Sequence, residues 1–199
     1  MAVPLGLTAD GYEIQFGTNH VGHALLIKHM LPMMLRTAKD YGDARIVCLA
    51  STAFDIAPKA GIIFKDLRST MDMGIWSTWT RYGQSKLANL LYGAQLAQHY
   101  PDLSVAVVHP GIIQTDLVNG LGFANKMLVR LTNIGQMKSP EEGAQNSLWA
   151  ATVDKKSLKS GAYYLPVAEP GKHKKLSQDT KLAQELWDWT QKELEGHQL

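Results

Sequence analysis

The sequence has few of the features that would tie it to a disulfide-rich, membrane or nucleic-acid-binding class. Its 199 residues include a single cysteine, Cys48, so no disulfide framework is possible and Cys48 is expected to be a small core residue in a reducing compartment. The net charge of +2 is too small to indicate nucleic acid as a partner. Lys28 and Pro32 interrupt the apolar stretch 24–35, so no transmembrane segment is predicted. No secretory signal is visible, and the protein is expected to be cytoplasmic.

Metal and phosphate patterns are absent as well. His20, His23 and His29 have no carboxylate or thiol nearby that would complete a coordination set, so no metal site is predicted. No glycine-rich phosphate loop is found, because the nearest pattern, Gly120-Leu-Gly122, follows no predicted strand. The basic cluster Lys172–Lys175 is flanked by turn residues and is interpreted as a solvated loop, with a phosphate or partner site as the alternative.

The apolar pattern predicts helices and strands in alternation. Thr8 is the expected N-cap of the first helix, which Pro32 should bend or end, and Ser139-Pro140 is the expected start of a later helix. The predicted elements are a helix to about residue 37, a strand at 44–51, a helix at 78–99, a strand at 104–109, a helix from 140 to near 153, a strand at 161–166 and a helix at 176–194. This alternation predicts an α/β fold with parallel strands, helices on both faces and one domain over residues 1–199.

A tyrosine and a lysine stand four residues apart near the start of the helix 78–99. Side chains at this spacing share a helix face, so the ammonium of Lys86 could lie near the phenol of Tyr82 and lower its pKa toward neutrality. This makes Tyr82 a candidate general acid/base, although an exposed tyrosine and a solvated lysine fit the spacing equally well. The surroundings favour the first interpretation, because one apolar strand ends at Ser51 and another leads directly into Pro110-Gly111.

Four stretches together resemble the short-chain dehydrogenase/reductase family, in the order that the family shows. They are Gln15-Phe-Gly-Thr-Asn19-His-Val-Gly22-His23, Arg45-Ile-Val-Cys-Leu-Ala-Ser51, Tyr82-Gly-Gln-Ser-Lys86-Leu-Ala-Asn-Leu-Leu91 and His109-Pro110-Gly111-Ile-Ile113-Gln-Thr115. The long gap between Ser51 and Tyr82 is most similar to the branch that contains retinol dehydrogenases and WW-domain oxidoreductases, and to fungal relatives in secondary metabolism.

The resemblance implies catalytic roles for four residues. In the reducing direction Tyr82 would give a proton to a carbonyl oxygen that Ser51 also binds, and Lys86 would support the phenol and reach the nicotinamide ribose. Asn19 would mark a helix distortion that frees a carbonyl for a water linked to Lys86. The alternatives are purely structural roles, in which Ser51 caps the end of the strand and Asn19 is a surface or packing residue.

The resemblance also implies a cofactor and a class of substrate. Tyr82, Lys86, Pro110, Gly111, Ile113 and Thr115 would contact NADP (or NAD) at its nicotinamide end. The segments 52–76 and 114–131 would line the substrate site, and their apolar composition indicates a hydrophobic alcohol, ketone or aldehyde.

The chain departs from the family at the phosphate loop. The family begins with a strand, a Thr-Gly-x-x-x-Gly-x-Gly loop and a helix that holds the pyrophosphate, and nothing here fits this pattern. The expectation is the C-terminal part of a doubly wound Rossmann-type parallel sheet, with about three strands and flanking helices and with the first four strands absent. The strand 44–50 should then be an open edge.

Three functional hypotheses follow. The first is an NAD(P)-dependent oxidoreductase of which this chain is the catalytic part. The second is a truncated, non-catalytic relative that acts as an interaction partner, as a homodimer or heterodimer through the helices 10–37 and 78–99. The third is the product of a broken gene.

Overall fold

The computed structural model describes residues 1–113, 126, 127, 129 and 137–197, and it has the α/β architecture that the sequence predicts. In the described residues, β1 (Arg45–Leu49), β2 (Ser104–Val108), β5 (Tyr163–Leu165) and β6 (Glu169–Pro170) form a sheet in the order β1-β2-β5-β6. The first three strands are parallel and β6 is antiparallel. A second small sheet pairs β3 (Ile112–Ile113) with β4 (Met137–Lys138). Three parallel strands with flanking helices confirm the predicted class.

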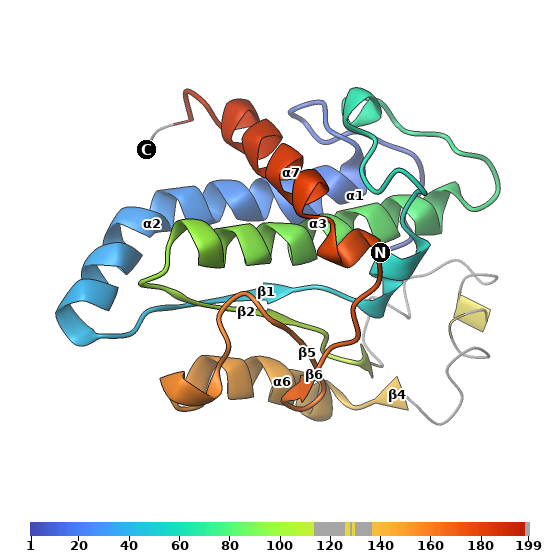
Figure 1. Ribbon diagram of the computed structural model, residues 1–199. Coiled ribbons are helices and arrows are strands. Elements are labelled where there is room, and N and C mark those ends of the chain that lie inside the picture. Colours follow the sequence, from blue (N-terminus) through green and yellow to red (C-terminus); the bar gives the residue numbers. More distant parts are fainter. Residues whose placement is uncertain (114–125, 128, 130–136, 198–199) are drawn as a thin grey trace.

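The helices lie in two layers on opposite faces of the sheet (Figure 1). One layer contains α2, α3 and α7, and the other contains α6. The α-helices are α1 (Ile14–Phe16), α2 (Gly22–Tyr41), α3 (Ser77–His99), α6 (Pro140–Thr152) and α7 (Thr180–Glu193), and the other helical turns are η1 (Gly17–Val21, a π-helix), η2 (Thr52–Ile56), η3 (Phe64–Asp66), η4 (Lys155–Ser157) and η5 (Leu176–Gln178).

The strand β2 is buried throughout, and its side chains divide between the two faces. Val105 and Val107 join the larger core under α3, whereas Ala106 and Val108 pack toward α6 with Ala150. This is the burial expected for a continuous apolar run in a parallel sheet. The strand therefore fixes the positions of both helix layers relative to the residues that follow it.

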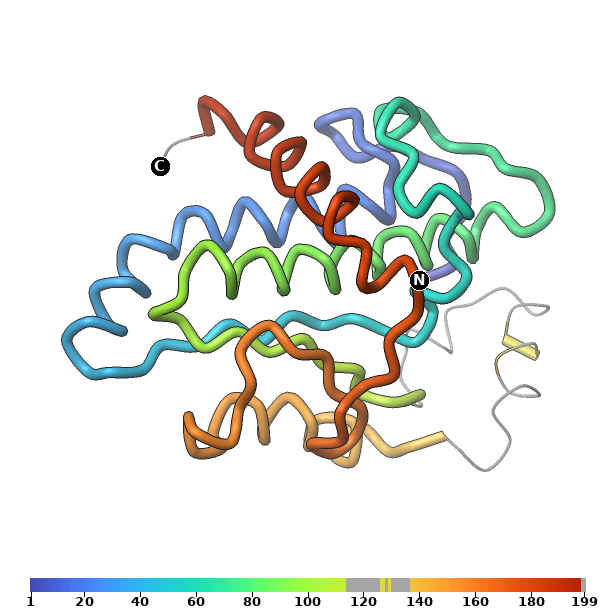
Figure 2. The backbone as a smooth tube through the Cα atoms, viewed as in Figure 1, coloured from blue at the N-terminus to red at the C-terminus, as the bar shows by residue number. Residues whose placement is uncertain are grey.

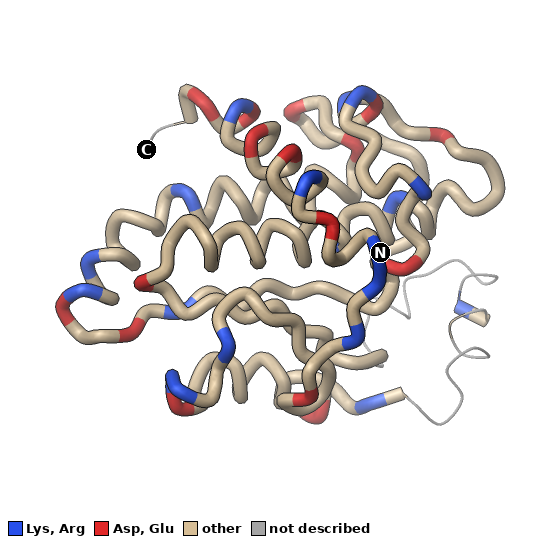
Figure 3. Tube along the Cα trace, viewed as in Figure 1, with Lys and Arg blue, Asp and Glu red and all other residues tan. Residues whose placement is uncertain are grey.

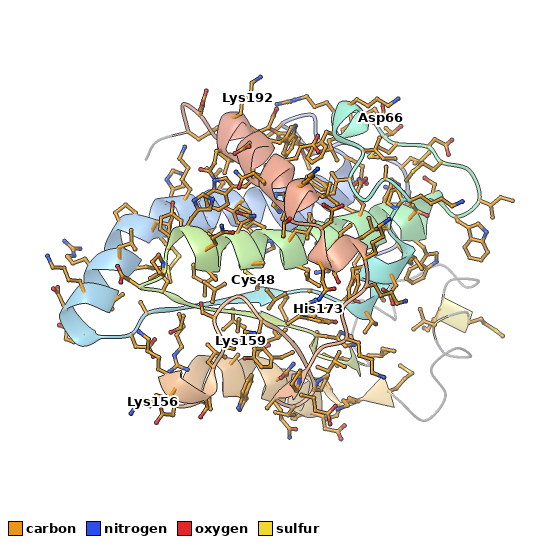
Figure 4. The ribbon with its side chains drawn as sticks, viewed as in Figure 1. Cys48, Asp66, Lys156, Lys159, His173 and Lys192 are labelled. Carbon is orange, nitrogen blue, oxygen red and sulfur yellow. The ribbon has the colours of Figure 1, made fainter. Side chains whose placement is uncertain are left out.

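The strand β1 is an edge strand within the part of the chain that the structure describes. Its pairing to β2 runs from Arg45 opposite Ser104 to Leu49 opposite Val108, and its burial is only partial. Leu49 is 48% exposed. The expectation of an open edge at residues 44–50 agrees with this arrangement. Cys48 points from β1 toward α3 (Figure 4), where its Sγ lies 3.8 Å from the Cβ position of Gly93, and burial raises the pKa of its thiol to about 12.

The start of the first helix differs from the prediction. Helix α1 begins at Ile14, and the carboxylate of Glu13 accepts hydrogen bonds from the amides of Gln15 and Phe16. Thr8 instead stabilises a turn, in which its hydroxyl accepts from the amide of Tyr12 at 3.2 Å. The assignment of Thr8 as the N-cap was wrong because a threonine hydroxyl accepts a backbone hydrogen bond equally well as a helix N-cap and within a turn. The local sequence does not distinguish the two.

The end of this helix is also later than predicted. Helix α2 continues through Pro32 to Tyr41, bends toward the sheet in its second half (Figure 1), and stops at Gly42 with φ of 80°. Pro32 is exposed, so its missing amide hydrogen bond leaves a carbonyl that water can reach. The predicted start of α6 is confirmed, because Ser139 and Glu142 form a reciprocal capping box with Pro140 at the first helical position.

The segment between β1 and α3 is irregular and folds over the N-terminal end of α3 (Figure 2). It lies beside the N-terminal segment, and the amide of Glu13 donates to the carbonyl of Leu67 at 2.8 Å. Charged residues are concentrated on the loops and outer helices, while most of β1, β2 and α3 carries none (Figure 3). The basic cluster at 172–175 is largely exposed, and Lys174 pairs with Asp55 at 2.6 Å.

Candidate functional site

A cavity of about 310 Å³ lies at the carboxyl ends of β1 and β2, where the sequence places its candidate residues. Ligand sites of open α/β sheets commonly occupy this edge. The cavity is lined by Met1, Ala50, Ser51, Thr52, Ala53, Trp79, Tyr82, His109, Pro110, Gly111, Ile112, Ile113 and Val129. Five of the predicted site residues therefore meet in one cavity, namely Ser51, Tyr82, Pro110, Gly111 and Ile113.

Ser51 stands just after β1 and is the N-cap of η2. Its backbone is extended (φ −161°, ψ 152°) and its Oγ accepts from the amide of Ala53 at 3.2 Å. The same hydroxyl lines the cavity together with Tyr82 and lowers the pKa of that phenol. The strand-end cap and the predicted functional role are therefore both compatible with this geometry, because one hydroxyl caps η2 and also acts on the phenol.

Tyr82 lies in the second turn of α3 and is 9% exposed. Its ring packs edge-on against Trp79, with centroids 6.3 Å apart. Burial raises the pKa of Tyr82, and Ser51 acts in the opposite direction. The predicted lowering by Lys86 is thus not found, because desolvation of the phenolate is the larger effect in this state.

Lys86 lies one turn after Tyr82, with its Nζ 5.8 Å from the centroid of the Tyr82 ring. The ammonium donates to the carbonyl of Leu49 at 3.1 Å, and the amide of Asn89 donates to the same carbonyl at 2.9 Å. Burial lowers the pKa of Lys86 to about 8. The predicted proximity of the two side chains is therefore confirmed, while the ammonium is held by the end of β1 and by no carboxylate among the described residues.

Asn19 does not line the cavity but contacts α3 through Ser85. It falls within the π-helix η1, which is the helix distortion expected at this position. Its Nδ2 donates to the Oγ of Ser85 at 3.0 Å, and Ser85 in turn donates to the carbonyl of Tyr82 at 2.8 Å. The backbone carbonyl of Asn19 lies 3.1 Å from Nδ1 of His23. Asn19 therefore contacts the tyrosine-bearing helix through one intervening hydroxyl.

The loop after β2 is held rigidly on its outer side. The carbonyl of His109 accepts from Nδ2 of Asn146 at 2.8 Å, and the amide of His109 donates to Tyr164 at 2.9 Å. Gly111 has φ of 87°, a conformation that favours glycine, and Ile113 is in β3. Pro110 and Gly111 both line the cavity, whereas a Cβ at Gly111 would lie 3.2 Å from Cδ of Lys138. Thr115 lies outside the described residues.

The residues around Tyr82 each bind a different segment of the chain. The guanidinium of Arg81 pairs with Glu13 at 2.5 Å, with both side chains fully buried, and also donates to the carbonyl of Val3 at 2.9 Å. The side chain of Gln84 accepts from the amide of Ile63 at 2.9 Å. With the contact from Ser85 to Asn19, these bonds hold the first turns of α3 on three sides.

The sequence analysis did not single out several of the residues that line the cavity or support the site. Trp79 is three residues before Tyr82 on the same helix face, so helical spacing could have indicated it. His109 lines the cavity, and burial together with the charges of Lys138 and Lys86 lowers its pKa to about 4. The ion pair between Glu13 and Arg81 joins positions far apart in sequence, and no local pattern indicates it.

The described residues contain no group of three or more histidine, cysteine, aspartate or glutamate side chains that could hold a metal ion. Within the same residues, no helix combines the length and the apolar character that crossing a membrane requires.

A parallel sheet with a serine and a tyrosine at its carboxyl edge is a Rossmann-type α/β arrangement, and comparison with known proteins defines it further. The chain is 35% identical over 213 aligned positions to the short-chain dehydrogenase/reductase drtF of Aspergillus calidoustus, with 100% of this chain and 67% of the relative covered. It is 38% identical to an uncharacterised oxidoreductase of Schizosaccharomyces pombe (96% and 58% covered) and 33% identical to human retinol dehydrogenase 14 (93% and 53% covered). No family model matches the chain.

Solved structures give the same result. An uncharacterised protein from Mycobacterium paratuberculosis aligns with a TM-score of 0.69 and 28% identity, covering 96% of this chain and 62% of that one. The NADPH-bound carbonyl reductase from chicken fatty liver shares the fold, with a TM-score of 0.55 and 20% identity over 87% of this chain and 62% of that one. The chain belongs to the short-chain dehydrogenase/reductase family, and it spans between 53% and 67% of the length of the three sequence relatives named above.

Proposed function

We propose that this chain carries the proton-transfer site of an NAD(P)-dependent oxidoreductase that interconverts an alcohol and a ketone or aldehyde. The observation that carries the proposal is that Ser51 and Tyr82 line the same mostly apolar cavity, where Ser51 lowers the pKa of the Tyr82 phenol, with the ammonium of Lys86 one helical turn away. Two hydroxyls in one cavity can both bind a single substrate oxygen, which is the arrangement that carbonyl reduction needs.

In the reducing direction Tyr82 donates its hydroxyl proton to the carbonyl oxygen of the substrate. Ser51 donates a hydrogen bond to the same oxygen, where negative charge develops. The pKa of Tyr82 is raised by burial, so its phenol is protonated and ready to donate at neutral pH. Lys86 offsets the charge left on Tyr82 after the transfer, because its ammonium lies on the same face of α3. Asn19 positions this turn of α3 through Ser85.

The residues present fit the nicotinamide end of the cofactor. Gly111 lines the cavity, and Lys86 would exchange the carbonyl of Leu49 for a ribose hydroxyl. Pro110, Ile113 and Thr115 complete the proposed contacts, and NADP is proposed ahead of NAD on the family resemblance alone. A bound nicotinamide would supply the hydride that reaches the carbonyl carbon.

The proposed substrate is a hydrophobic small molecule. Trp79, Ile112 and Val129 give the cavity an apolar wall, while the hydroxyls of Ser51 and Tyr82 are concentrated at one side. The cavity also includes Thr52 and Ala53 from the segment expected to line the substrate site. Secondary metabolism and a cytoplasmic location are proposed from the sequence, and a fluorescent fusion would test the location.

The test is turnover with NADPH and with NADH on a panel of apolar ketones and aldehydes, followed in reverse with the matching alcohols. Tyr82→Phe should lower turnover by a factor on the order of 10² to 10⁴, since the ring is kept and only the proton-donating hydroxyl is lost. Tyr92→Phe is the matched control, because Tyr92 is a buried tyrosine of the same helix that lies outside the cavity. Equal turnover by wild type and Tyr82→Phe would contradict the proposal.

An exposed apolar surface on α2 favours a second candidate function, in which the chain acts as an interaction partner. Leu26, Met30 and Met33 are exposed along one side of α2, with Leu26 55% exposed. Helix α3 offers no such row, since its exposed residues are Ala94, Gln98 and His99. We therefore propose α2 as the dimer contact in this second function. Sedimentation of Met33→Glu against the exposed control Arg36→Glu tests it, and equal association of both variants would contradict it.

A further inference from the structure

Gly83, directly after Tyr82, is where the serine-bearing segment touches the tyrosine-bearing helix. A Cβ at this position would lie 2.6 Å from the carbonyl oxygen of Ala53, 2.8 Å from the amide nitrogen of Ala57 and 2.9 Å from the carbonyl carbon of Ile56. All three are backbone atoms of η2 and its C-cap. Backbone atoms cannot rotate aside as the end of a side chain can, so any side chain here would push η2 away from α3.

Gly83 is connected to Ser51 through one residue, Ala53. Ser51 is the N-cap of η2, and its Oγ is bonded to the amide of Ala53, the residue whose carbonyl meets Gly83. Ala53 is thus held to Ser51 on one side and lies against Gly83 on the other. Ser51 also lines the cavity with Tyr82, the residue before Gly83, and lowers the pKa of its phenol. The spacing of the two hydroxyls therefore depends on how closely η2 approaches α3.

We propose that Gly83 is a positioning residue for the reaction, whose missing side chain sets the distance between the hydroxyls of Ser51 and Tyr82. This rests on the proposed function, in which both hydroxyls bind one substrate oxygen. Misplacement of about 1 Å at a reacting group can reduce the rate by about 10²-fold, so the contact matters for turnover more than for binding.

The first experiment substitutes Gly83→Ala, with Gly93→Ala as the matched control on the same helix. A Cβ at Gly93 meets the Val107 methyl Cγ2 at 2.3 Å, which is a side chain in the sheet and not the backbone of η2. We expect Gly83→Ala to lower kcat by about tenfold or more with little change in KM, and Gly93→Ala to keep kcat. Unchanged kcat in folded Gly83→Ala would overturn the proposal.

The second experiment measures the effect of Ser51 on the pKa of the Tyr82 hydroxyl and does not depend on turnover. In protein labelled with ¹³C at the tyrosine Cζ, the Tyr82 signal is assigned by its loss in Tyr82→Phe and titrated by NMR. Since Ser51 lowers the pKa of Tyr82, Ser51→Ala should raise it and Gly83→Ala should raise it too. The double variant should match Ser51→Ala alone. Additive shifts, or a Gly83→Ala titration like that of wild type, would overturn the proposal.

These readouts separate the two proposals. Inactivity of every variant, wild type included, speaks against the proposed function, while the titration still tests Gly83. If Gly83→Ala does not fold, wild-type protein provides the measurement: the Gly83 Hα and the Ala57 amide proton should give a strong nuclear Overhauser effect. Its absence would overturn the close approach on which the proposal rests.

Discussion

Arg81 and Glu13 form an ion pair in which both side chains are fully buried, with Nη1 and Oε1 2.5 Å apart. The carboxylate also caps α1, and the guanidinium reaches the carbonyl of Val3. One buried pair thus joins the N-terminal segment to the helix that carries Tyr82. Such pairs stabilise little compared with apolar substitutes, but removal of one partner leaves an unpaired buried charge.

Removal of one member of this pair should be strongly destabilising. Arg81→Ala is expected to lower the free energy of unfolding by about 3 to 5 kcal/mol, because the fully buried Glu13 loses its counter-charge. Urea denaturation followed by circular dichroism measures the loss. Arg81→Met combined with Glu13→Leu should be much less destabilising than Arg81→Ala. A double variant as unstable as the single one would contradict this explanation.

A second link, at the surface, should contribute less. The hydroxyl of Tyr12 donates to Glu193 at 2.7 Å and accepts from Arg68 at 3.0 Å, so that it joins α7 to the loop before α3. Tyr12→Phe should lower the free energy of unfolding by about 1 kcal/mol, the usual contribution of one hydrogen bond. Thermal denaturation monitored at several wavelengths would measure it. Because phenylalanine keeps the ring, a loss as large as that of Arg81→Ala would contradict the assignment of about one hydrogen bond's contribution to this hydroxyl.

Acid should destabilise the protein through two buried histidines. Burial lowers the pKa of His20 to about 3 and that of His109 to about 4, whereas both are near 6.5 in the unfolded chain. The unfolded state therefore binds more protons between about pH 6.5 and 3, so stability is full above this window and falls as the pH falls through it. In His20→Gln the free energy of unfolding should change less between pH 7 and pH 4. Identical slopes in wild type and variant would refute the assignment.

Turnover should fall on the alkaline side because of Lys86. Burial lowers the pKa of its ammonium to about 8, so above about pH 8 the lysine is neutral and no longer offsets the charge left on Tyr82. The rate of carbonyl reduction should therefore decline above this pH. Lys86→Arg keeps its charge and should move the decline to higher pH, even if its overall rate is lower. A pH–rate profile of wild type and Lys86→Arg checks this. If the rates of the two proteins decline at the same alkaline pH, Lys86 is not the group responsible for the decline.

The 199 residues alone should bind NADP(H) only weakly. The sequence has no Thr-Gly-x-x-x-Gly-x-Gly pattern, so the proposed cofactor contacts are limited to the nicotinamide and its ribose. A calorimetric titration should give a Kd weaker than about 1 mM. Micromolar binding by the isolated chain would show that a phosphate site exists elsewhere on it.

Much of the fold was predictable because its signals are local. The capping box at Ser139, the buried run of β2 and the helical spacing of Tyr82 and Lys86 are each contained in a few consecutive residues. The sequence also predicted five residues that line one cavity. The local pattern did not predict how deeply Tyr82 is buried. Segments distant in sequence bury it, and this burial raises the pKa of its phenol.

Long-range partners were equally hidden. Glu13 and Arg81 are 68 positions apart, and either could have been a solvated surface charge. The approach of η2 to Gly83 is also a tertiary contact. A glycine allows such a contact, but its presence in the sequence does not predict one. In both cases the sequence supplies a suitable residue, and only the packed structure shows what it meets.

The turn of α3 around Tyr82 is fastened to three separate parts of the chain, through Arg81 to Glu13, Gln84 to Ile63 and Ser85 to Asn19. None of these parts is adjacent to the tyrosine in sequence, so the tyrosine acquires its place only when all of them have docked. If Tyr82 has the proposed role, competence for proton transfer depends on the completed fold and not on the helix alone. We then expect loss of turnover in heat or urea to coincide with global unfolding, with no activity in a partly folded state.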